Sequence, residues 1–152
     1  MSPVKKSSLA TYLQSTNQNF FTIYTDWFRQ MKYRLRSLNL THPQFQILAT
    51  VYGLSLSEPE VTQIMVAKAA DVDAMTASSI ITKLSRDDLL DRFPGKKSPR
   101  SKALSLTEAG ERKLQEALDT VNTFNQDYWS QFDPTLVDQM AAVMPIVKSH
   151  HF

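Results

Sequence analysis

The chain has 152 residues, of which 42% are hydrophobic and 21% charged, with a formal net charge of +2, as is typical of one globular domain. It contains no cysteine, which excludes disulfides, thiolate metal sites and cysteine catalysis. No apolar stretch resembles a signal peptide or a membrane span of ~20 residues, so we predict a soluble cytoplasmic protein. Residues 1–102 carry 14 Lys and Arg against 8 Asp and Glu, whereas residues 103–152 carry 3 against 7.

The first predicted element is a long amphipathic helix over residues 8–37, in which apolar side chains recur at spacings of three, four and seven without Pro or Gly. A helix of ~30 residues is ~45 Å long, whereas a compact domain of this chain length is only ~38 Å across. We therefore expect that this helix either breaks or packs against a second copy of the chain. Its apolar residues are Leu9, Leu13, Phe20, Tyr24, Trp27, Phe28, Met31 and Leu35.

A second helix is predicted to begin at Thr41. Gln44 can close a capping box with Thr41, and Pro43 is tolerated in a first turn. We expect this helix to end at Gly53 and to be followed by an exposed loop over residues 54–59.

The next two helices are short and are separated by a turn at residues 71–73. The first is predicted from Thr62 to about Ala70, and the second covers residues 74–87. The side chains expected to face inward are Ile64, Met65 and Ala67 in the first helix, and Ala77, Ile80, Ile81 and Leu84 in the second.

Residues 89–93 and 102–106 read as two short strands, joined by a loop that contains the breaker pairs Pro94-Gly95 and Ser98-Pro99. This hairpin carries five cations and no acid between residues 92 and 102. Such a loop can neutralise DNA phosphates, and an arginine at its tip can enter the minor groove. The alternative is a solvated loop that protects a sheet edge from aggregation. The cations are Arg92, Lys96, Lys97, Arg100 and Lys102.

Two further helices complete the chain. Thr107 caps one with an apolar stripe over residues 114–128, and Asp133 opens another with a stripe over residues 136–147, which Pro145 is expected to bend or shorten. A short helix, a turn, a second helix and a basic hairpin form the plan of a winged helix-turn-helix. We therefore predict a mainly α fold with a small β-hairpin wing.

The helix over residues 74–87 is the expected recognition helix. Short hydroxyl side chains near its start can reach phosphates or base edges, although they could also only solvate the outer face. Because we assign no Arg, Asn or Gln to the outer face of this helix, we expect modest sequence discrimination that relies partly on DNA shape and on the wing. The predicted DNA contacts are Thr76, Ser78, Ser79 and Lys83 on the helix, and Lys96, Lys97, Arg100 and Lys102 on the wing.

Four segments, in this order, resemble motifs of the MarR-type winged-helix regulators. Residues 40–45 are similar to the family's L-T-x-x-Q-F, and residues 84–92 are similar to its L-x-x-x-G-L-[VI]-x-R. Residues 98–100 stand where the wing has D-x-R, and residues 106–110 resemble L-T-x-x-G. The resemblance covers most of the chain.

Two residues depart from the family pattern. Asp88 stands where the family has a glycine, and aspartate tolerates a positive φ better than most residues. Ser98 stands where the wing has an aspartate, so a charged partner for nearby arginines is lost. Arg100, the expected minor-groove residue, is kept.

The resemblance implies a homodimer that reads pseudo-palindromic double-stranded DNA and commonly acts as a repressor. We expect residues 1–38 and 107–152 to form a helical dimerisation region and residues 39–106 a winged helix-turn-helix, in one intertwined domain. The apolar stripes that would then form chiefly dimer core are residues 9–35, 114–128 and 136–147.

The resemblance also implies release of DNA by a small lipophilic or anionic effector. Such a site would lie between the dimerisation helices and the winged helix. Large aromatic residues on the first helix are candidates for its lining, although core packing is the alternative. The candidates are Phe20, Tyr24, Trp27 and Phe28.

Other chemistries have little support. The three histidines, His42, His150 and His151, lack the spacing of metal ligands. Three separate glycines cannot form a phosphate loop, and the acid pairs near Glu60 and Asp87 lie in polar sequence where solvation is expected. We expect no catalytic residue, metal, cofactor or enzyme activity. The alternative to a DNA-binding regulator is a protein-interaction module that keeps the fold with weak or no operator recognition.

Overall fold

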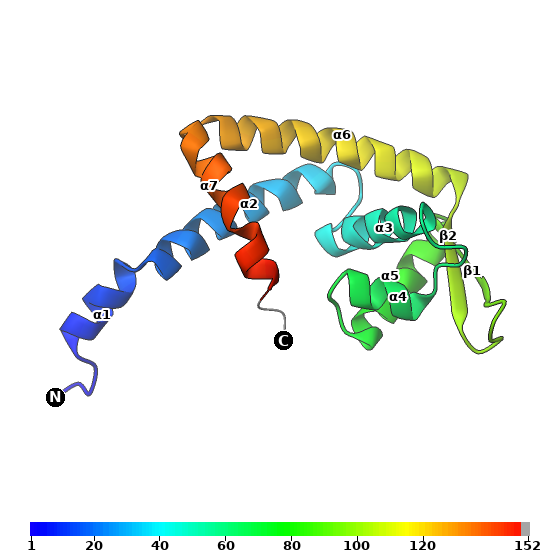
Figure 1. Cartoon of the computed structure of the whole chain (residues 1–152), viewed down its shortest axis with the longest axis horizontal. Helices are drawn as coiled ribbons and strands as arrows, with labels where there is room; N and C mark the ends of the chain where they lie inside the picture. Colours follow the sequence, from blue (N-terminus) through cyan, green and yellow to red (C-terminus); the bar gives the residue numbers. More distant parts are fainter. Residues whose placement is uncertain (150–152) are drawn as a thin grey trace.

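The computed structural model describes residues 1–149, so His150 and His151 lie outside the described residues. It has the predicted mainly α fold with a two-stranded antiparallel hairpin (Figure 1). Helices α3 to α5 and the hairpin gather at one end of the molecule, beside the start of α6. The elements are α1 (Lys6–Leu13), α2 (Thr16–Arg36), α3 (His42–Ser55), α4 (Gln63–Ala69), α5 (Ala74–Arg86), β1 (Leu90–Pro94), β2 (Lys102–Leu106), α6 (Glu108–Ser130) and α7 (Pro134–Lys148).

The predicted N-terminal helix is interrupted at Gln14 and Ser15. The Ser15 Oγ donates a hydrogen bond to the carbonyl of Tyr12 at 2.7 Å and accepts one from the backbone N–H of Gln18 at 3.2 Å. It therefore closes α1 and caps α2 with one hydroxyl group. Of the two alternatives for the long helix, the structure shows the break, and α1 extends away from the rest of the chain (Figure 1).

The hydrophobic core joins the second half of α2 to α3, α5 and α6. The stripe over residues 114–128 is buried within the core of its own chain. The prediction that this stripe forms chiefly the core of a dimer is therefore wrong. In the first stripe, Met31 and Leu35 are buried in the same core, whereas Phe20 is 67% exposed. The buried residues of α6 are Gly110, Leu114, Ala117, Val121, Phe124 and Tyr128.

Three helical details differ from the predictions. Helix α3 continues past Gly53, whose position leaves open space and has no positive φ. In the short helix α4, Ile64 is 76% exposed and Val66 is buried, because only one face of this helix reaches the core. Helix α7 continues through Pro145, which lies so close to the C-terminal end that few helical hydrogen bonds are affected.

The hairpin is extended by a short third segment. Strands β1 and β2 pair with Leu90 opposite Leu106, and on the other edge of β2 Ala103 forms a bridge with Thr62. The residues that lead into α4 therefore lie along the strand that returns from the wing.

The first turn of α6 makes a close backbone contact with the hairpin. The Thr107 N–H donates to the carbonyl of Leu89 at 3.1 Å, and its Oγ1 donates to the carbonyl of Asp88 at 2.7 Å. A Cβ added at Gly110 would overlap the carbonyl oxygen of Leu89. Asp88 has a φ of 59°, as expected for the residue that takes the place of a glycine.

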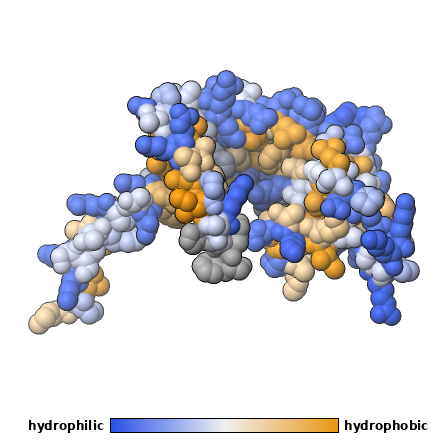
Figure 2. Space-filling view, in the orientation of Figure 1, coloured by the Kyte–Doolittle hydropathy of each residue, from blue (hydrophilic) through white to orange (hydrophobic). Residues whose placement is uncertain are grey.

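Helices α1 and α7 contribute no buried residue. Figure 2 shows apolar side chains gathered over α7, which turns back from the end of α6. Within residues 1–149, no helix is both long enough and apolar enough to span a membrane. The exposed apolar residues of α7 include Val137, Met140, Val143, Met144 and Val147.

Because Gly110 lies so close to Leu89, we predict that a methyl group added at Gly110 lowers the free energy of unfolding. Gly110→Ala must push the start of α6 away from Leu89, because the obstacle is backbone and not a flexible side chain. Overpacking of this kind costs about 1–3 kcal/mol. Urea unfolding at a fixed protein concentration measures the change in free energy of unfolding.

Gly53→Ala is the matched control. The added methyl group meets nothing within 4 Å in α3, so this variant should be more stable than the parent by about 0.5–1 kcal/mol, the difference in helix propensity. Equal free energies of unfolding for Gly110→Ala and the parent would contradict the close contact.

Candidate nucleic-acid interface

The N-terminus of α5 is organised by Asp73. Its Oδ1 accepts a hydrogen bond from the Thr76 N–H at 2.8 Å, and its Oδ2 accepts one from the Thr76 Oγ1 at 2.6 Å. These hydrogen bonds, that of the Thr76 side chain first, hold the pKa of the Asp73 carboxyl below its ordinary value. The cap therefore stays charged and fixes the orientation of the predicted contact Thr76.

The other predicted residues of α5 lie along its outer side. Ser79 and Lys83 are exposed, and Ser78 is half-buried. The Lys83 Nζ lies 3.0 Å from the Asp87 Oδ1 in an exposed pair. Exposed pairs of this kind contribute little to stability, so Lys83 remains available for a phosphate.

Two exposed residues of α5 were missed by the predictions. Met75 is 84% exposed, and Arg86 is exposed in the last turn. Both lie on the stripe of Ser79, because spacings of four, seven and eleven residues fall on one face of a helix. The expectation of a face without arginine is therefore wrong, and extending the helical spacing by one turn would have found Arg86.

The four predicted wing cations lie in and beside the turn of the hairpin. Their side chains are exposed, and within residues 1–149 none of them forms an ion pair. The turn is closed by a hydrogen bond from the Gly95 N–H to the Ser101 carbonyl at 2.7 Å. The wing therefore presents four cationic side chains that form no ion pair, and Figure 2 shows its surface as hydrophilic. These cations are Lys96, Lys97, Arg100 and Lys102.

A further hydrogen bond links the wing to α5. The Arg92 Nη1 donates to the Thr82 Oγ1 at 3.2 Å. The sequence analysis did not predict a contact between these two residues, because nothing local indicates that a strand side chain reaches a helix ten residues earlier. This bond connects β1 directly to α5.

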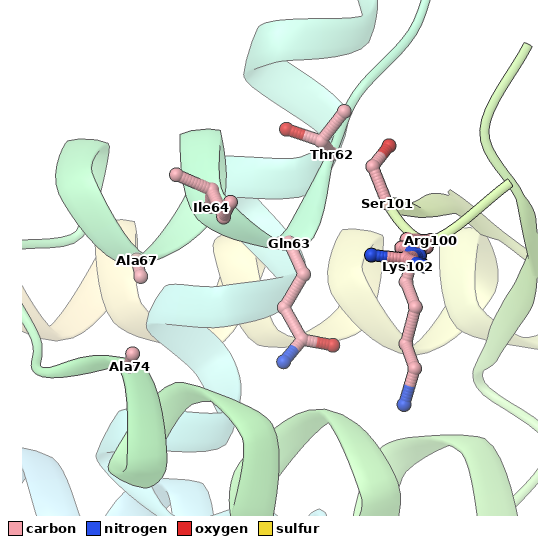
Figure 3. Close-up of a pocket in the computed structure, with 8 residues that line it drawn as sticks. All are labelled: Thr62, Gln63, Ile64, Ala67, Ala74, Arg100, Ser101 and Lys102. Carbon is pink, nitrogen blue, oxygen red and sulfur yellow. The ribbon is translucent and has the colours of Figure 1, made fainter. Parts of the chain in front are cut away.

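A cavity of about 260 Å³ lies where the base of the wing meets α4 and α5. The side chains of Gln63 and Lys102 both extend toward α5 (Figure 3). The Gln63 Oε1 is buried without a hydrogen-bond partner among the described residues. The cavity brings Arg100 and Lys102 to the same place as the first residue of α5. It is lined by Thr62, Gln63, Ile64, Ala67, Ala74, Arg100, Ser101 and Lys102.

The candidate effector residues form an aromatic row along α2. Tyr24 stacks on Phe20 and Phe28 with ring centroids 6.4 and 5.5 Å apart, and Trp27 lies beside both Tyr24 and Phe28. The Trp27 Nε1 donates to the Asn125 Oδ1 at 2.9 Å, so Trp27 also links α2 to α6. The cavity at the base of the wing is lined by other residues.

The aromatic row continues onto α3 through His42. Its ring meets the Phe28 ring edge-on, with the ring centroids 4.8 Å apart. The Lys32 Nζ lies over the Phe28 ring, 4.7 Å from its centroid. Burial, and secondarily the charge of Lys32, lowers the pKa of His42. Within residues 1–149, no three His, Asp or Glu side chains are placed to hold a metal ion.

Comparison with protein families and sequences identifies relatives of the chain. A family profile described as "ArnR1-like, winged-helix domain" matches residues 30–124. The uncharacterized HTH-type transcriptional regulator YdcH of Bacillus subtilis (strain 168) is 28% identical over 104 residues, which cover 68% of this chain and 71% of YdcH.

Solved structures share the fold along nearly the whole chain. Staphylococcus aureus MepR in complex with DNA matches with a TM-score of 0.78 at 22% identity, over 90% of this chain and 98% of MepR. Bordetella bronchiseptica BpsR, whose DNA binding is regulated by 6-hydroxynicotinic acid, matches with a TM-score of 0.79 at 15% identity, over 99% of this chain and all of BpsR. At these identities the likeness is one of fold.

The environment of His42 predicts a pH dependence of stability. Folding disfavours the protonated imidazole, so the unfolded chain binds this proton more readily than the folded chain. The contribution of neutral His42 is therefore complete above its ordinary pKa of 6.5 and is lost as the pH falls below it. Urea unfolding between about pH 7.5 and about pH 5 should show a steeper loss for the parent than for His42→Gln.

Lys32→Gln serves as the control for the charge contribution. Removal of this neighbouring cation should raise the pKa of His42 only in part, because burial is the larger cause. Parallel stability curves for the parent and His42→Gln would show that His42 is not responsible for the pH dependence.

Proposed function

This chain belongs to the ArnR1-like winged-helix family and has the fold of the MarR-type transcription regulators, and we propose that it is a repressor that binds a pseudo-palindromic operator as a homodimer. The observation that carries the proposal is the arrangement of α5 and the wing, which present hydroxyl groups and unpaired cations from adjoining surfaces. Supporting comparisons include MepR in complex with DNA and a variant of Escherichia coli MarR with operator DNA.

The apolar surfaces that the single chain leaves exposed support a dimer. Helix α7 has no substantial contact with another element within residues 1–149, and burial of such surfaces is the main driving force for association. We assign dimerisation to helices within residues 1–38 and 107–152, and DNA binding to residues 39–106. The core of α6 is occupied by its own chain, so the dimer contact falls to α1, the first half of α2, and α7.

The proposed reading of DNA combines two grooves. We assign Thr76, Ser78, Ser79 and Lys83 to the major groove or its flanking phosphates, because they lie on the outer side of α5. The wing cations contact phosphates, and Arg100 enters the minor groove. Arg86 adds a cation at the far end of the same helix face.

Met75 is a further candidate for base recognition. It lies in the first turn of α5, where recognition helices commonly meet base edges, and its apolar side chain is almost fully exposed. The methyl group of thymine is the apolar feature of the major groove. We therefore propose that Met75 contacts a thymine methyl group.

The aromatic row of α2 is the proposed effector site. Phe20 and Tyr24 present exposed rings, and Phe28 connects the row to His42 on α3. A lipophilic or anionic aromatic molecule bound there would touch the dimerisation helix and the winged helix at once. BpsR, which shares the fold, is regulated by an aromatic acid of this kind.

DNA selection at two salt concentrations tests the proposed function. If about four cations per chain contact phosphates, a dimer neutralises about eight, and the logarithm of the binding constant should fall with the logarithm of salt concentration with a slope near −7. The protein should also select a two-half-site sequence from a random pool. Light scattering records its mass alongside.

A slope flatter than about −2 contradicts this account. A dimer that ignores competing DNA oligomers at physiological salt would support the alternative, a protein-interaction module that keeps the fold. In that case the wing cations would meet an acidic protein surface.

The proposed role of Met75 predicts sensitivity to a single methyl group. Replacing the contacted thymine of the selected operator by deoxyuridine should weaken binding by the parent about fourfold, since one buried methyl group contributes about 0.8 kcal/mol. Met75→Ala should bind both DNAs equally, whereas Ser79→Ala should keep the preference for thymine. Fluorescence anisotropy measures the affinities of these three proteins for the two DNAs. An unchanged preference in Met75→Ala would assign the methyl contact to another residue.

A further inference from the structure

Residues 92–102 of the wing contain no acid, but an acid from another segment reaches them. Glu60 lies in the loop between α3 and α4, and its Oε2 accepts a hydrogen bond from the backbone N–H of Lys96 at 2.7 Å. The two residues are 36 positions apart. Hydrogen bonds between a backbone N–H and a carboxylate are stronger than neutral ones.

The rest of the Glu60 segment is fixed to the wing as well. The carbonyl of Val61 accepts a hydrogen bond from the Leu104 N–H at 2.8 Å, and Thr62 forms the bridge with Ala103. Val61 and Thr62 therefore follow the edge of β2, and the side chain of Glu60, the residue before them, reaches the turn through its hydrogen bond with Lys96. The backbone of Glu60 cannot move away from the wing without breaking this pairing.

The turn itself is packed around the Glu60 carboxylate. Gly95 is buried, and a Cβ added there would lie 3.1 Å from the Glu60 Oε1. The Gly95 N–H is used within the turn by the Ser101 carbonyl, and the neighbouring Lys96 N–H is left for Glu60. Both oxygens of Glu60 are therefore close to the residues at which the chain leaves β1.

We propose that Glu60 is a positioning residue that holds the turn over residues 95–101 so that Arg100 meets the DNA in one orientation; this inference rests on the proposed function. Glu60 contacts the backbone of the turn and leaves the cationic side chains free for phosphates. A loop of seven residues without this tie would present its cations over a range of positions, which suffices for phosphate attraction but not for reading groove width.

Removal of the Glu60 carboxylate should have two opposite effects on DNA binding, and these distinguish a positioning role from a purely electrostatic one. Loss of the Glu60 carboxylate removes a negative charge beside the wing, which should strengthen binding to random DNA. Loss of the hydrogen bond should loosen the turn and reduce discrimination between DNA sequences. A residue that acts only through its charge would show the first effect alone.

Glu58 provides the matched control. It lies two residues earlier in the same loop and is exposed. Glu58→Ala and Glu60→Ala change the net charge equally, but only Glu60→Ala removes the acceptor for the Lys96 N–H. Glu60→Gln removes the charge and keeps an amide oxygen that can accept the same hydrogen bond.

The first experiment needs no DNA. Amide hydrogen exchange followed by NMR should show the Lys96 N–H exchanging about tenfold faster in Glu60→Ala than in the parent, because a hydrogen bond to a charged group is lost. Glu58→Ala should leave this rate unchanged, and Glu60→Gln should lie between the two. The Gly110 N–H reports whether the fold is intact, and its rate should be equal in all four proteins.

The second experiment measures affinity for the selected operator with A·T-rich or with G·C-rich flanks. The parent should prefer the A·T-rich flanks, and Arg100→Ala should lose this preference. Glu60→Ala should lose this preference to the same extent, while its affinity for random DNA rises about twofold, because one negative charge is removed from each chain. Glu58→Ala and Glu60→Gln should show the same rise in affinity for random DNA but should keep the preference for A·T-rich flanks.

Each failure has its own meaning. Equal flank preferences in Glu60→Ala and Glu58→Ala, or an unchanged exchange rate at Lys96, overturn the positioning role while the proposed function stands. A parent protein that selects no operator and shows a flat salt slope overturns the proposed function and the role of Glu60 with it.

Discussion

The backbone contact between Gly110 and the carbonyl of Leu89 sets the geometry on which the winged helix depends. It places the first turn of α6 directly on the start of β1, where Thr107 bonds to the carbonyls of two successive residues. Helix α6 also packs against α2 and α3, so the strand that begins the wing is joined directly to a helix of the hydrophobic core. A displacement of α6 would therefore reach the wing without passing through a flexible linker.

The parts of the fold that were predictable are those decided by neighbours in the chain. Helix starts at Thr41, Thr62 and Thr107 were predicted because a capping side chain accepts a hydrogen bond from a residue only three positions later. The positive φ of Asp88 was predictable for the same reason, since it is a property of one residue in one turn. The strands and the order of elements followed from spacing and breaker residues.

The features that escaped prediction depend on what the tertiary structure places together. The stripe over residues 114–128 looks the same whether it packs on its own chain or on another, and only the folded chain shows which. Glu60 was expected to be merely solvated, since nothing in a polar loop indicates a bond to a residue 36 positions away. The break at Ser15 was harder to see, because the apolar spacing continues across it.

The wing has a consequence for protein engineering, since its functional unit is not continuous in the chain. The hairpin from Leu90 to Leu106 carries the cations, but the edge that supports it comes from residues 60–62, before α4. A hairpin transplanted alone into a related regulator would leave its support behind. To transfer a DNA preference between such proteins, the hairpin and residues 60–62 should therefore be transferred together from the same donor protein.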